Sequence, residues 1–381
     1  MTGHQRRLAV IASFTATLLT TVVFFTSPTE NASSAMILSA VATSVSTSPD
    51  AAPTTTALVP AASSTTSPRG LESTAAPAHS RWTLVFGGDT LFTRPVRRSA
   101  RTPFARVLPA LDTSDLAIVN LETALTERGT IQAKSYTFRS PPEFSEVLKD
   151  AGIDVVSLAN NHTLDFGTVG LLDTLENLDA AGVGRVGAGH TITEALTPFV
   201  VDRGGVRIAI LGASQIIPAA TWVAQSTRPG ISSAGKHVLD VNTERVLVAV
   251  RESHKRADVV VVVMHWGIEG DPCPSAVQRR LAKELHAAGA SIVLGAHPHV
   301  LQPIEFSGTN LTAFSLGNFI WDPRSGATAD TGTLEVTFVG PAPVSYRFHP
   351  HRLDGNGWAA SVEPSTPTGR RIEARTSRRC R

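Results

Sequence analysis

Acidic, amide and imidazole side chains follow the apolar runs of this sequence, at positions where the strands of a sheet would end. Asp89 closes the run TLVFGGD, and Glu122 follows LAIVNL. The pair Asn161-His162 ends DVVSLANNH, and His265 closes VVVVVMH. In open α/β sheets ligands bind beyond the carboxyl ends of the strands, so we expect these side chains to share one site.

A Pro-spaced pair of histidines, His297-Pro298-His299, ends a further apolar run, SIVLGA. In an extended segment residues i and i+2 project to the same side, so we expect both imidazoles to reach one site. Gly295 in this run admits the close approach of another backbone segment. The same letters recur at His349-Pro350-His351 in an alternating strand with no apolar run before it. We expect that second pair to be exposed and without function.

The ligand types in this set point to metal chemistry. Imidazole, carboxylate and amide oxygen suit divalent Mn, Fe or Zn, and the number of donors is enough for one or two such ions. Each residue also has an ordinary structural role open to it, as a turn, capping or core residue. A metal site is favoured because independent structural roles would not place all of them at strand ends. The predicted metal ligands are Asp89, Glu122, Asn161, His265, His297 and His299.

The elements that must position these residues alternate between strand and helix. Segments Ser275–Ala288 and Thr168–Ala181 carry apolar residues at helical spacing, and each ends before a glycine. This alternation predicts an α/β fold, with one domain over residues 81–355. Three later segments lack intervening helices, which predicts antiparallel strands. They are 311–319, 331–339 and 344–350.

The N-terminal segment 1–26 predicts export. Arg6 and Arg7 precede the uncharged stretch LAVIASFTATLLTTVVFF, as in a signal peptide or a membrane anchor. Either alternative places the rest of the chain outside the cytoplasm, at the cell membrane or secreted. Residues 27–80 are rich in Ser, Thr, Pro and Ala, with too little large apolar surface to offset chain entropy. We expect a disordered linker there.

Charge and cysteine content narrow the function further. The net charge is +2, without the basic excess of a nucleic-acid-binding domain, so no nucleic-acid partner is expected. Cys273 and Cys380 allow one disulfide at most, so the fold cannot depend on a framework of them. The last twelve residues carry six arginines. Such a run predicts a disordered, solvated segment that could touch an anionic polymer or lipid, within an Arg-rich tail over 356–381.

Six motifs, taken in order, resemble the motif series of the CapA family. These are bacterial capsule (poly-γ-glutamate) biosynthesis proteins within the calcineurin-like metallophosphoesterase superfamily. The motifs are GDTLFTR, DLAIVNLETALT, SLANNHTLDFGTVGLLDTLENLDAAGV, VVVMHWGIEGDP, GAHPHVLQPIE and SLGNFIWD, which span roughly residues 82–325. The resemblance implies a metallophosphoesterase-like four-layer αββα sandwich with a dinuclear metal site at the strand ends.

The resemblance also assigns the ligands to two metals. It makes Asp89 the first-motif aspartate and puts Glu122 in place of the superfamily's bridging aspartate. One position departs from the pattern, because the superfamily's first motif is Asp-x-His and Leu91 stands at its third position. One metal therefore loses an imidazole, which leaves weaker or absent occupancy of that site open. The implied sites are Asp89, Glu122 and His299 for this metal, and Glu122, Asn161, His265 and His297 for the other.

Two catalytic roles are implied as well. By resemblance, His162 is an acid over the site that is not a metal ligand, and it would protonate a leaving oxygen while two metals lower the pKa of a bridging water. Asp165, three residues on, either orients the His162 ring or caps a turn. Asn318, in the last motif, is expected to shape the pocket.

Three functions follow as alternatives. The first is a metal-dependent hydrolase at the cell surface, acting on a phosphoester or on a linkage of an anionic surface polymer. The second is a non-catalytic accessory protein that holds polymer beside membrane-bound capsule synthesis subunits. The third is a structural wall-associated module, which the cluster of strand-end ligands disfavours.

Overall fold

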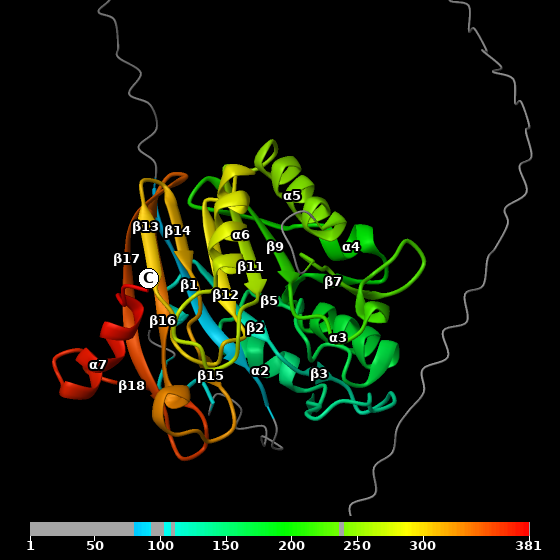
Figure 1. The fold of residues 1–381 in the computed structure, drawn as a ribbon, viewed down its shortest axis with the longest axis horizontal. Coiled ribbons are helices and arrows are strands. Elements are labelled where there is room, and N and C mark those ends of the chain that lie inside the picture. Colours follow the sequence, from blue (N-terminus) through cyan, green and yellow to red (C-terminus); the bar gives the residue numbers. More distant parts are fainter. Residues whose placement is uncertain (1–79, 93–102, 108–110, 236–239, 381) are drawn as a thin grey trace, which may run out of the picture. The chain divides into compact units, whose positions relative to one another are not determined.

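Two β-sheets form the centre of the described chain (Figure 1). The computed structural model describes residues 80–92, 103–107, 111–235 and 240–380. The predicted signal peptide or anchor at 1–26, and all of the predicted linker at 27–80 except Ser80, lie outside the described residues. Within the described ranges, no helix is both long enough and apolar enough to span a membrane.

The first sheet has the strand order β18-β17-β16-β1-β2-β5-β6, and β15 (Asn318–Ile320) also pairs with β1. Its parallel half consists of β1 (Arg81–Thr90), β2 (Leu116–Leu121), β5 (Val155–Ser157) and β6 (Gly184–Val186). Its antiparallel half consists of β16 (Asp330–Val339), β17 (Ala342–Leu353) and β18 (Ala359–Ser361). The pairing of β16 with β17 confirms the antiparallel strands predicted at 331–339 and 344–350.

The second sheet has the order β13-β14-β12-β11-β9-β8. Four strands are mutually parallel: β9 (Val206–Ser214), β11 (Val259–His265), β12 (Ile292–Ala296) and β14 (Asn310–Ala313). The edge strands β8 (Phe199–Arg203) and β13 (Ile304–Ser307) are antiparallel to their neighbours. Two short pairs complete the strands: β3 (Ala124–Leu125) with β4 (Arg139–Ser140), and β7 (Ala188–Gly189) with β10 (Gly230–Ile231).

The prediction of one antiparallel strand over 311–319 is confirmed only in part. The structure divides this segment between β14 of the second sheet, which lies antiparallel to β13 and parallel to β12, and β15, which lies parallel to β1 of the first sheet. Gly317 directly precedes β15 and has a φ of 68°, a left-handed conformation that glycine adopts without steric cost. The chain therefore crosses from one sheet to the other within a few residues.

Helices cover the outer faces of both sheets. They are α2 (Phe144–Asp150), α3 (Gly167–Ala181), α4 (Ile192–Leu196), α5 (Val241–His254) and α6 (Ala276–Ala287), with short 3-10 turns at Ala220–Trp222 and Gly326–Ala329. Helix α3 confirms the helix predicted at 168–181, and its C-cap, Gly182, is left-handed. Helix α6 confirms the helix predicted at 275–288, since Ser275 and Gln278 form a capping box at its start.

The buried side chains show why these layers stack. Val259, Val261 and Val263 of β11 lie in a cluster with apolar residues of the first sheet, whereas Val260 and Val262 pack with residues of α5 and α6. Successive strand residues point to opposite faces, so a strand buried on both faces reads as one continuous apolar run. A third cluster joins α2 and α3 to the outer face of the first sheet. The fold is therefore the predicted four-layer αββα sandwich.

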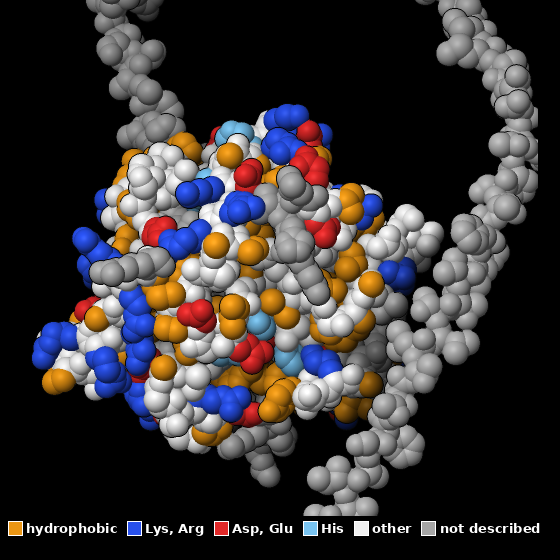
Figure 2. Space-filling view, in the orientation of Figure 1, with side chains coloured by type: hydrophobic (Ala, Val, Ile, Leu, Met, Phe, Trp, Pro, Cys, Tyr) orange, Lys and Arg blue, Asp and Glu red, His pale blue; other side chains and the backbone are white. Residues whose placement is uncertain are grey.

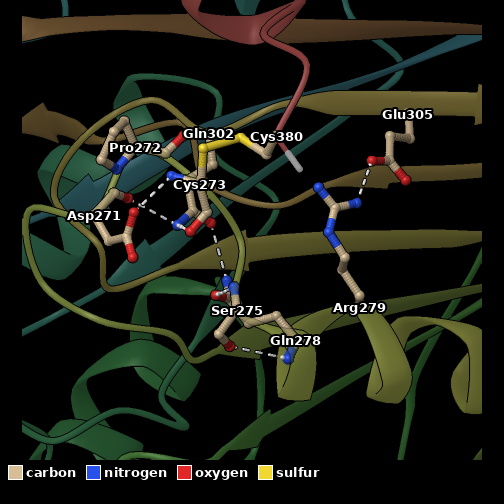
Figure 3. Close-up of a disulfide and its surroundings, with 9 residues drawn as sticks. All are labelled: Asp271, Pro272, Cys273, Ser275, Gln278, Arg279, Gln302, Glu305 and Cys380. Carbon is tan, nitrogen blue, oxygen red and sulfur yellow. Dashed lines mark hydrogen bonds and ion pairs between the residues drawn. A yellow bond between two sulfur atoms is a disulfide. The ribbon is translucent and has the colours of Figure 1, made fainter.

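The prediction that the arginine-rich run of the last twelve residues is disordered is wrong, because most of the run is helical. Strand β18 pairs with β17, and the arginine-rich segment forms helix α7 (Pro367–Thr376), drawn in red in Figure 1. Buried Asp330 accepts hydrogen bonds from Arg371 at 3.2 Å and Arg375 at 2.9 Å, so two of the arginines hold the helix. Cys380 forms a disulfide with Cys273 (Figure 3). The folded unit therefore extends beyond the predicted limit at residue 355.

Candidate metal centre

The predicted ligands lie at the carboxyl ends of strands from both sheets. Asp89 is the penultimate residue of β1, Glu122 comes directly after β2, and Asn161 lies in the turn after β5. From the other sheet, His265 is the last residue of β11, and His297 comes directly after β12. Both sheets present these ends at the same edge, so residues far apart in the chain meet there, as the sequence predicted.

Two overlapping triads form at this edge. Glu122, His265 and His297 offer ligand atoms that all lie within 4.8 Å of one another, and so do Asp89, Glu122 and His299. Glu122 belongs to both triads. Asn161 joins the first, because its Oδ1 lies 2.7 Å from Nε2 of His265. The structure thus brings together all six predicted ligands, in the two groups that the resemblance implied.

Burial is the main cause of the shifted pKa values of Glu122 and His265. Burial and the negative charge of Asp89 raise the pKa of Glu122 well above its usual value. Burial and the nearby histidines His297 and His299 hold the pKa of His265 well below its usual value. Both residues are thereby pushed toward their neutral forms. A bound cation would reverse the effect on Glu122, because positive charge favours the ionised carboxylate.

At Asp89, hydrogen bonds and nearby charge together affect the pKa more than burial does. Burial alone would raise the pKa of Asp89, but the hydrogen bond and charge of His299, with help from Asn120, outweigh it and hold the pKa below its usual value. Oδ2 of Asp89 lies 3.1 Å from Nδ1 of His299, and Oδ1 accepts a hydrogen bond from Asn120 Nδ2 at 2.8 Å. Asp89 is therefore ionised near neutral pH.

Two atoms of the cluster show that it fits a cation. Oε1 of Glu122 and Nδ1 of His297 are buried and have no hydrogen-bond partner among the described residues. A buried polar atom left unpaired costs about 1–3 kcal/mol, so such atoms call for a partner. Carboxylate oxygen and imidazole nitrogen are ligand atoms for divalent first-row metals. The residues present therefore suit the predicted ions.

The predicted extended geometry of His297-Pro298-His299 is wrong. His297 has a φ of 96° and His299 a φ of 55°, so both lie in the left-handed region that non-glycine residues seldom adopt. Such residues cost on the order of 1–3 kcal/mol each and cluster at functional sites. The carboxylate of Asp89 accepts a hydrogen bond from the backbone N of His297 at 3.2 Å, which helps to hold this turn. The turn, rather than strand alternation, directs both imidazoles to the cluster.

His162 lies beside the triads in contact with Asp165. Its Nδ1 is 2.6 Å from Oδ2 of Asp165, and its Nε2 is 3.9 Å from Oε1 of Glu122. Asp165 also accepts hydrogen bonds from Lys134 Nζ at 2.7 Å and from the backbone N of Phe138 at 2.6 Å. Of the two roles considered for Asp165, these contacts match the orientation of the His162 ring. Burial, which outweighs the effect of Asp165, lowers the pKa of His162.

A cleft of about 460 Å³ opens over the cluster. Figure 2 shows histidine and acidic side chains next to one another near the centre of the face drawn. His162 and His299 reach this cleft, as does Asn318, whose Oδ1 lies 2.9 Å from Nδ1 of His299. The other lining residues are Tyr136, Phe138, Glu269, Gly270, Trp321, Arg324 and Thr328.

Several residues around the site were missed by the sequence reasoning. Lys134 contacts Asp165 and donates to the backbone O of Asn161, yet it lies in an aperiodic segment that gave no signal. Glu269 forms a third triad with His297 and His299, with all ligand atoms within 4.8 Å. It follows His265 by four positions in the sequence HWGIE, and that spacing was the signal available.

The second His-Pro-His sequence is not a pair of exposed histidines. His351 is buried, and its Nε2 lies 3.1 Å from Oγ1 of Thr333 on β16. His349 is half-buried, and its Nε2 lies 2.9 Å from Oε2 of Glu335. The expectation of exposure is therefore wrong for His351. Neither residue belongs to a described triad of possible metal ligands.

The fold and this cluster define a two-sheet α/β sandwich with a candidate metal site, in which carboxylates and histidines gather at the strand ends. Residues 83–323 match the family model described as "Bacterial capsule synthesis protein PGA_cap". The chain belongs to this family of capsule synthesis proteins, as the motif series predicted.

Curated relatives agree with this assignment. The PGA biosynthesis protein CapA of Bacillus subtilis is 34% identical over 284 residues, covering 68% of this chain and 73% of its own. The capsule biosynthesis protein CapA of Bacillus anthracis is 32% identical, covering 66% of this chain and 63% of its own. A probable polyglutamine synthesis accessory protein of Mycobacterium tuberculosis is 31% identical, and the match covers 58% of this chain and 60% of that protein. The chain thus spans about two thirds of the length of these relatives.

Among solved structures, TT1561 of Thermus thermophilus aligns with 68% of this chain and 99% of its own. The sequence identity is 12% and the TM-score is 0.39. A likeness at that level supports no conclusion about function.

Proposed function

We propose that this chain is an exported capsule or poly-γ-glutamate synthesis protein that uses a metal site to hydrolyse a phosphoester or a polymer linkage. The observation that carries the proposal is the pair of overlapping triads, which share Glu122 and contain two buried ligand atoms without hydrogen-bond partners among the described residues. Family membership supports the polymer context, because the family and its relatives are named for capsule, PGA or polyglutamine synthesis.

The proposed ligands divide between two ions. Asp89, Glu122 and His299 would hold one ion, while Asn161, His265 and His297 would hold the other together with Glu122. When bound, such ions supply positive charge that polarises a phosphoryl or carbonyl oxygen and makes water more acidic. Mn, Fe and Zn all accept this mixture of nitrogen and oxygen ligands, so the ligand set leaves the metal's identity open.

His162 is the proposed proton-transfer residue. Its lowered pKa favours the neutral ring near neutral pH, and the 2.6 Å contact with Asp165 places the remaining proton on Nδ1. Nε2, which faces Glu122 and the cleft, would then accept the proton that the attacking water loses and pass it to the leaving oxygen. Asp165 fixes the ring orientation, and Lys134 in turn holds Asp165. Trp321 packs against His299 at 4.7 Å between ring centroids and closes one side of the cleft.

The location of the protein and its partners are part of the same proposal. Export rests on the signal-like segment 1–26, and the linker at 27–80 would hold the folded unit away from a membrane or within a cell wall. Arg324 at the cleft suits a substrate that carries negative charge, such as a phosphoester or a carboxylate polymer. Membrane-bound capsule synthesis subunits are the proposed protein partners.

A second candidate is a non-catalytic accessory protein that binds polymer at the same cleft. Leu91 favours it, because this residue is buried among apolar side chains and offers no ligand where the superfamily pattern has a histidine. The site facing His299 then has fewer protein ligands than its neighbour. The M. tuberculosis relative is itself described as a probable accessory protein.

Elemental analysis combined with turnover assays distinguishes the two. The full chain, purified without chelators, should contain Mn, Fe or Zn, and His297→Ala should lose most of it. The matched control is His190→Ala, which removes an exposed histidine outside the triads. Hydrolysis of a phosphodiester, a phosphomonoester or γ-glutamyl polymer supports the enzyme, and bound metal without turnover supports the accessory protein. Protein that neither contains nor takes up metal contradicts both versions of the site.

A further inference from the structure

The two proposed metal positions are unequal in the ligands that surround them. Four residues face one position, namely Glu122, Asn161, His265 and His297. On the other side only Asp89, Glu122 and His299 form a triad, and one of the three is shared. Divalent first-row metals take at least four ligands, so this side has room for another protein ligand.

Glu269 is placed to fill that gap. One of its carboxylate oxygens lies within 4.8 Å of ligand nitrogens of both His297 and His299. It is exposed and lines the cleft, so its side chain can adjust to an ion without disturbing the core. Its negative charge also acts on the cluster, since it helps to raise the pKa values of His299 and Glu122. Among the described residues, Asp89, Glu122 and Glu269 are the carboxylates that belong to the triads of possible metal ligands at this cluster.

Backbone hydrogen bonds hold the loop that carries Glu269 both before and after this residue. Before it, buried Trp266 donates a backbone hydrogen bond to Ala296 O at 3.1 Å, next to the histidine turn. After it, the backbone N of Gly270 donates to Pro298 O at 2.8 Å, between the two histidines themselves. The loop and the His297–His299 turn therefore form one unit. Glu269 is held near the histidines by backbone contacts rather than by its own side chain.

We propose that Glu269 is an additional metal ligand, which completes the position formed by Asp89, Glu122 and His299. This inference rests on the proposed metal site, but it does not depend on whether the protein is an enzyme. It assigns to Glu269 the part that a second imidazole would play at that position. A carboxylate is a suitable substitute because Mn and Fe accept oxygen ligands readily.

Binding of Mn²⁺ to the metal-stripped full chain tests the proposal. Electron paramagnetic resonance of free Mn²⁺ gives the number of bound ions and the affinity of each step. Glu269→Gln keeps the size of the side chain and removes its charge. We expect the weaker of two binding steps to lose at least about tenfold in affinity, with the tighter step unchanged, as for other supporting groups of metal sites. Glu284→Gln, an exposed carboxylate on α6 outside the triads, is the matched control.

The outcomes separate this inference from the function proposed above. Two binding steps in the wild type, with both affinities unchanged in Glu269→Gln and in Glu269→Ala, overturn the role of Glu269 and leave the metal site standing. A wild type that binds no Mn²⁺, Fe²⁺ or Zn²⁺ overturns the metal site, and the role of Glu269 with it. A selective loss at one step in both Glu269 variants, but not in Glu284→Gln, supports the proposal.

Discussion

Nδ1 of His299 lies 3.1 Å from Oδ2 of Asp89, and this contact joins the two sheets of the sandwich. Asp89 belongs to β1 of the first sheet, whereas His299 follows β12 of the second. The same carboxylate accepts a hydrogen bond from the backbone N of His297. The site therefore exists only when the sheets are packed, and its electrostatics depend on partners from opposite layers.

Replacing Asp89 with Asn should lower the pKa of His299 in the metal-stripped protein. Burial lowers the pKa of His299, but the hydrogen bond and charge of Asp89 outweigh it, so the pKa stands above its usual value. A raised pKa in the folded state stabilises the fold below the pKa of the unfolded chain, and this contribution is lost as pH rises through the folded value. Titration of the imidazole by NMR measures the shift.

Asn318→Ala provides the comparison for this experiment. Asn318 also helps to raise the pKa of His299, but it contributes less than Asp89. Its replacement should therefore lower the pKa by a smaller amount. The assignment fails if His299 titrates at the same pH in Asp89→Asn as in the wild type.

Replacing His162 with Ala should lower hydrolysis by about 10²–10⁴-fold if the proposed proton transfer is correct. Metal content should stay unchanged, because His162 is absent from the triads of possible ligands. Steady-state rates and elemental analysis of the same samples provide the two readouts. Asp165→Asn keeps the imidazole and should cause a smaller loss in rate, since it alters the ring's orientation and proton position. Wild-type turnover in His162→Ala would remove the residue from the mechanism.

Replacing His351 with Gln should make stability less sensitive to acid. Burial, with the charge of His349, lowers the pKa of His351 from 6.5 to about 3. The unfolded chain therefore binds the proton more readily, and stability falls as pH drops from 6.5 toward 3, by at most about 1.4 kcal/mol per pH unit for this residue. Urea unfolding at several pH values in this range gives the slope. Equal slopes in the wild type and the variant would show that His351 does not titrate in this way.

The sequence predicted those parts of the site that depend on local pattern. The apolar run Val259–His265 is buried along its whole length because it lies between the other sheet and two helices, and His265 ends it as predicted. Gly295 was expected to admit a close backbone, and a Cβ there would lie 2.0 Å from Phe314 O. The ends of such strands can be predicted because a strand buried on both faces is a continuous run of apolar residues. The first polar residue after the run marks the strand end.

Features set by tertiary contacts were not predictable in this way. The left-handed turn at His297 and His299 depends on Asp89, which is distant in sequence, so alternation suggested an extended segment instead. Helix α7 was predicted to be disordered because its arginines suggest a solvated tail, whereas Asp330 of β16 binds two of them. Glu269 lies on a loop without periodicity. In each case the decisive partner belongs to another element.

The disulfide between Cys273 and Cys380 joins the C-terminal end of the fold to the loop that carries Glu269 (Figure 3). Gln302 supports the same loop, since its Nε2 donates to the backbone O of Asp271 at 2.9 Å and of Cys273 at 3.1 Å. A cross-link over 107 residues restricts the unfolded chain considerably. Its removal should therefore lower the free energy of unfolding.

We expect the double variant Cys273→Ser, Cys380→Ser to lose about 2–4 kcal/mol in unfolding free energy, measured by urea titration under oxidising conditions. The variant should still fold, because β18 pairing and the Asp330 contacts hold the C-terminal segment independently. Dithiothreitol should lower the stability of the wild type to the level of the variant and leave the variant unchanged. If reduction leaves the wild type as stable as before, the cross-link contributes nothing, and Gln302 with the backbone contacts must suffice to hold the loop.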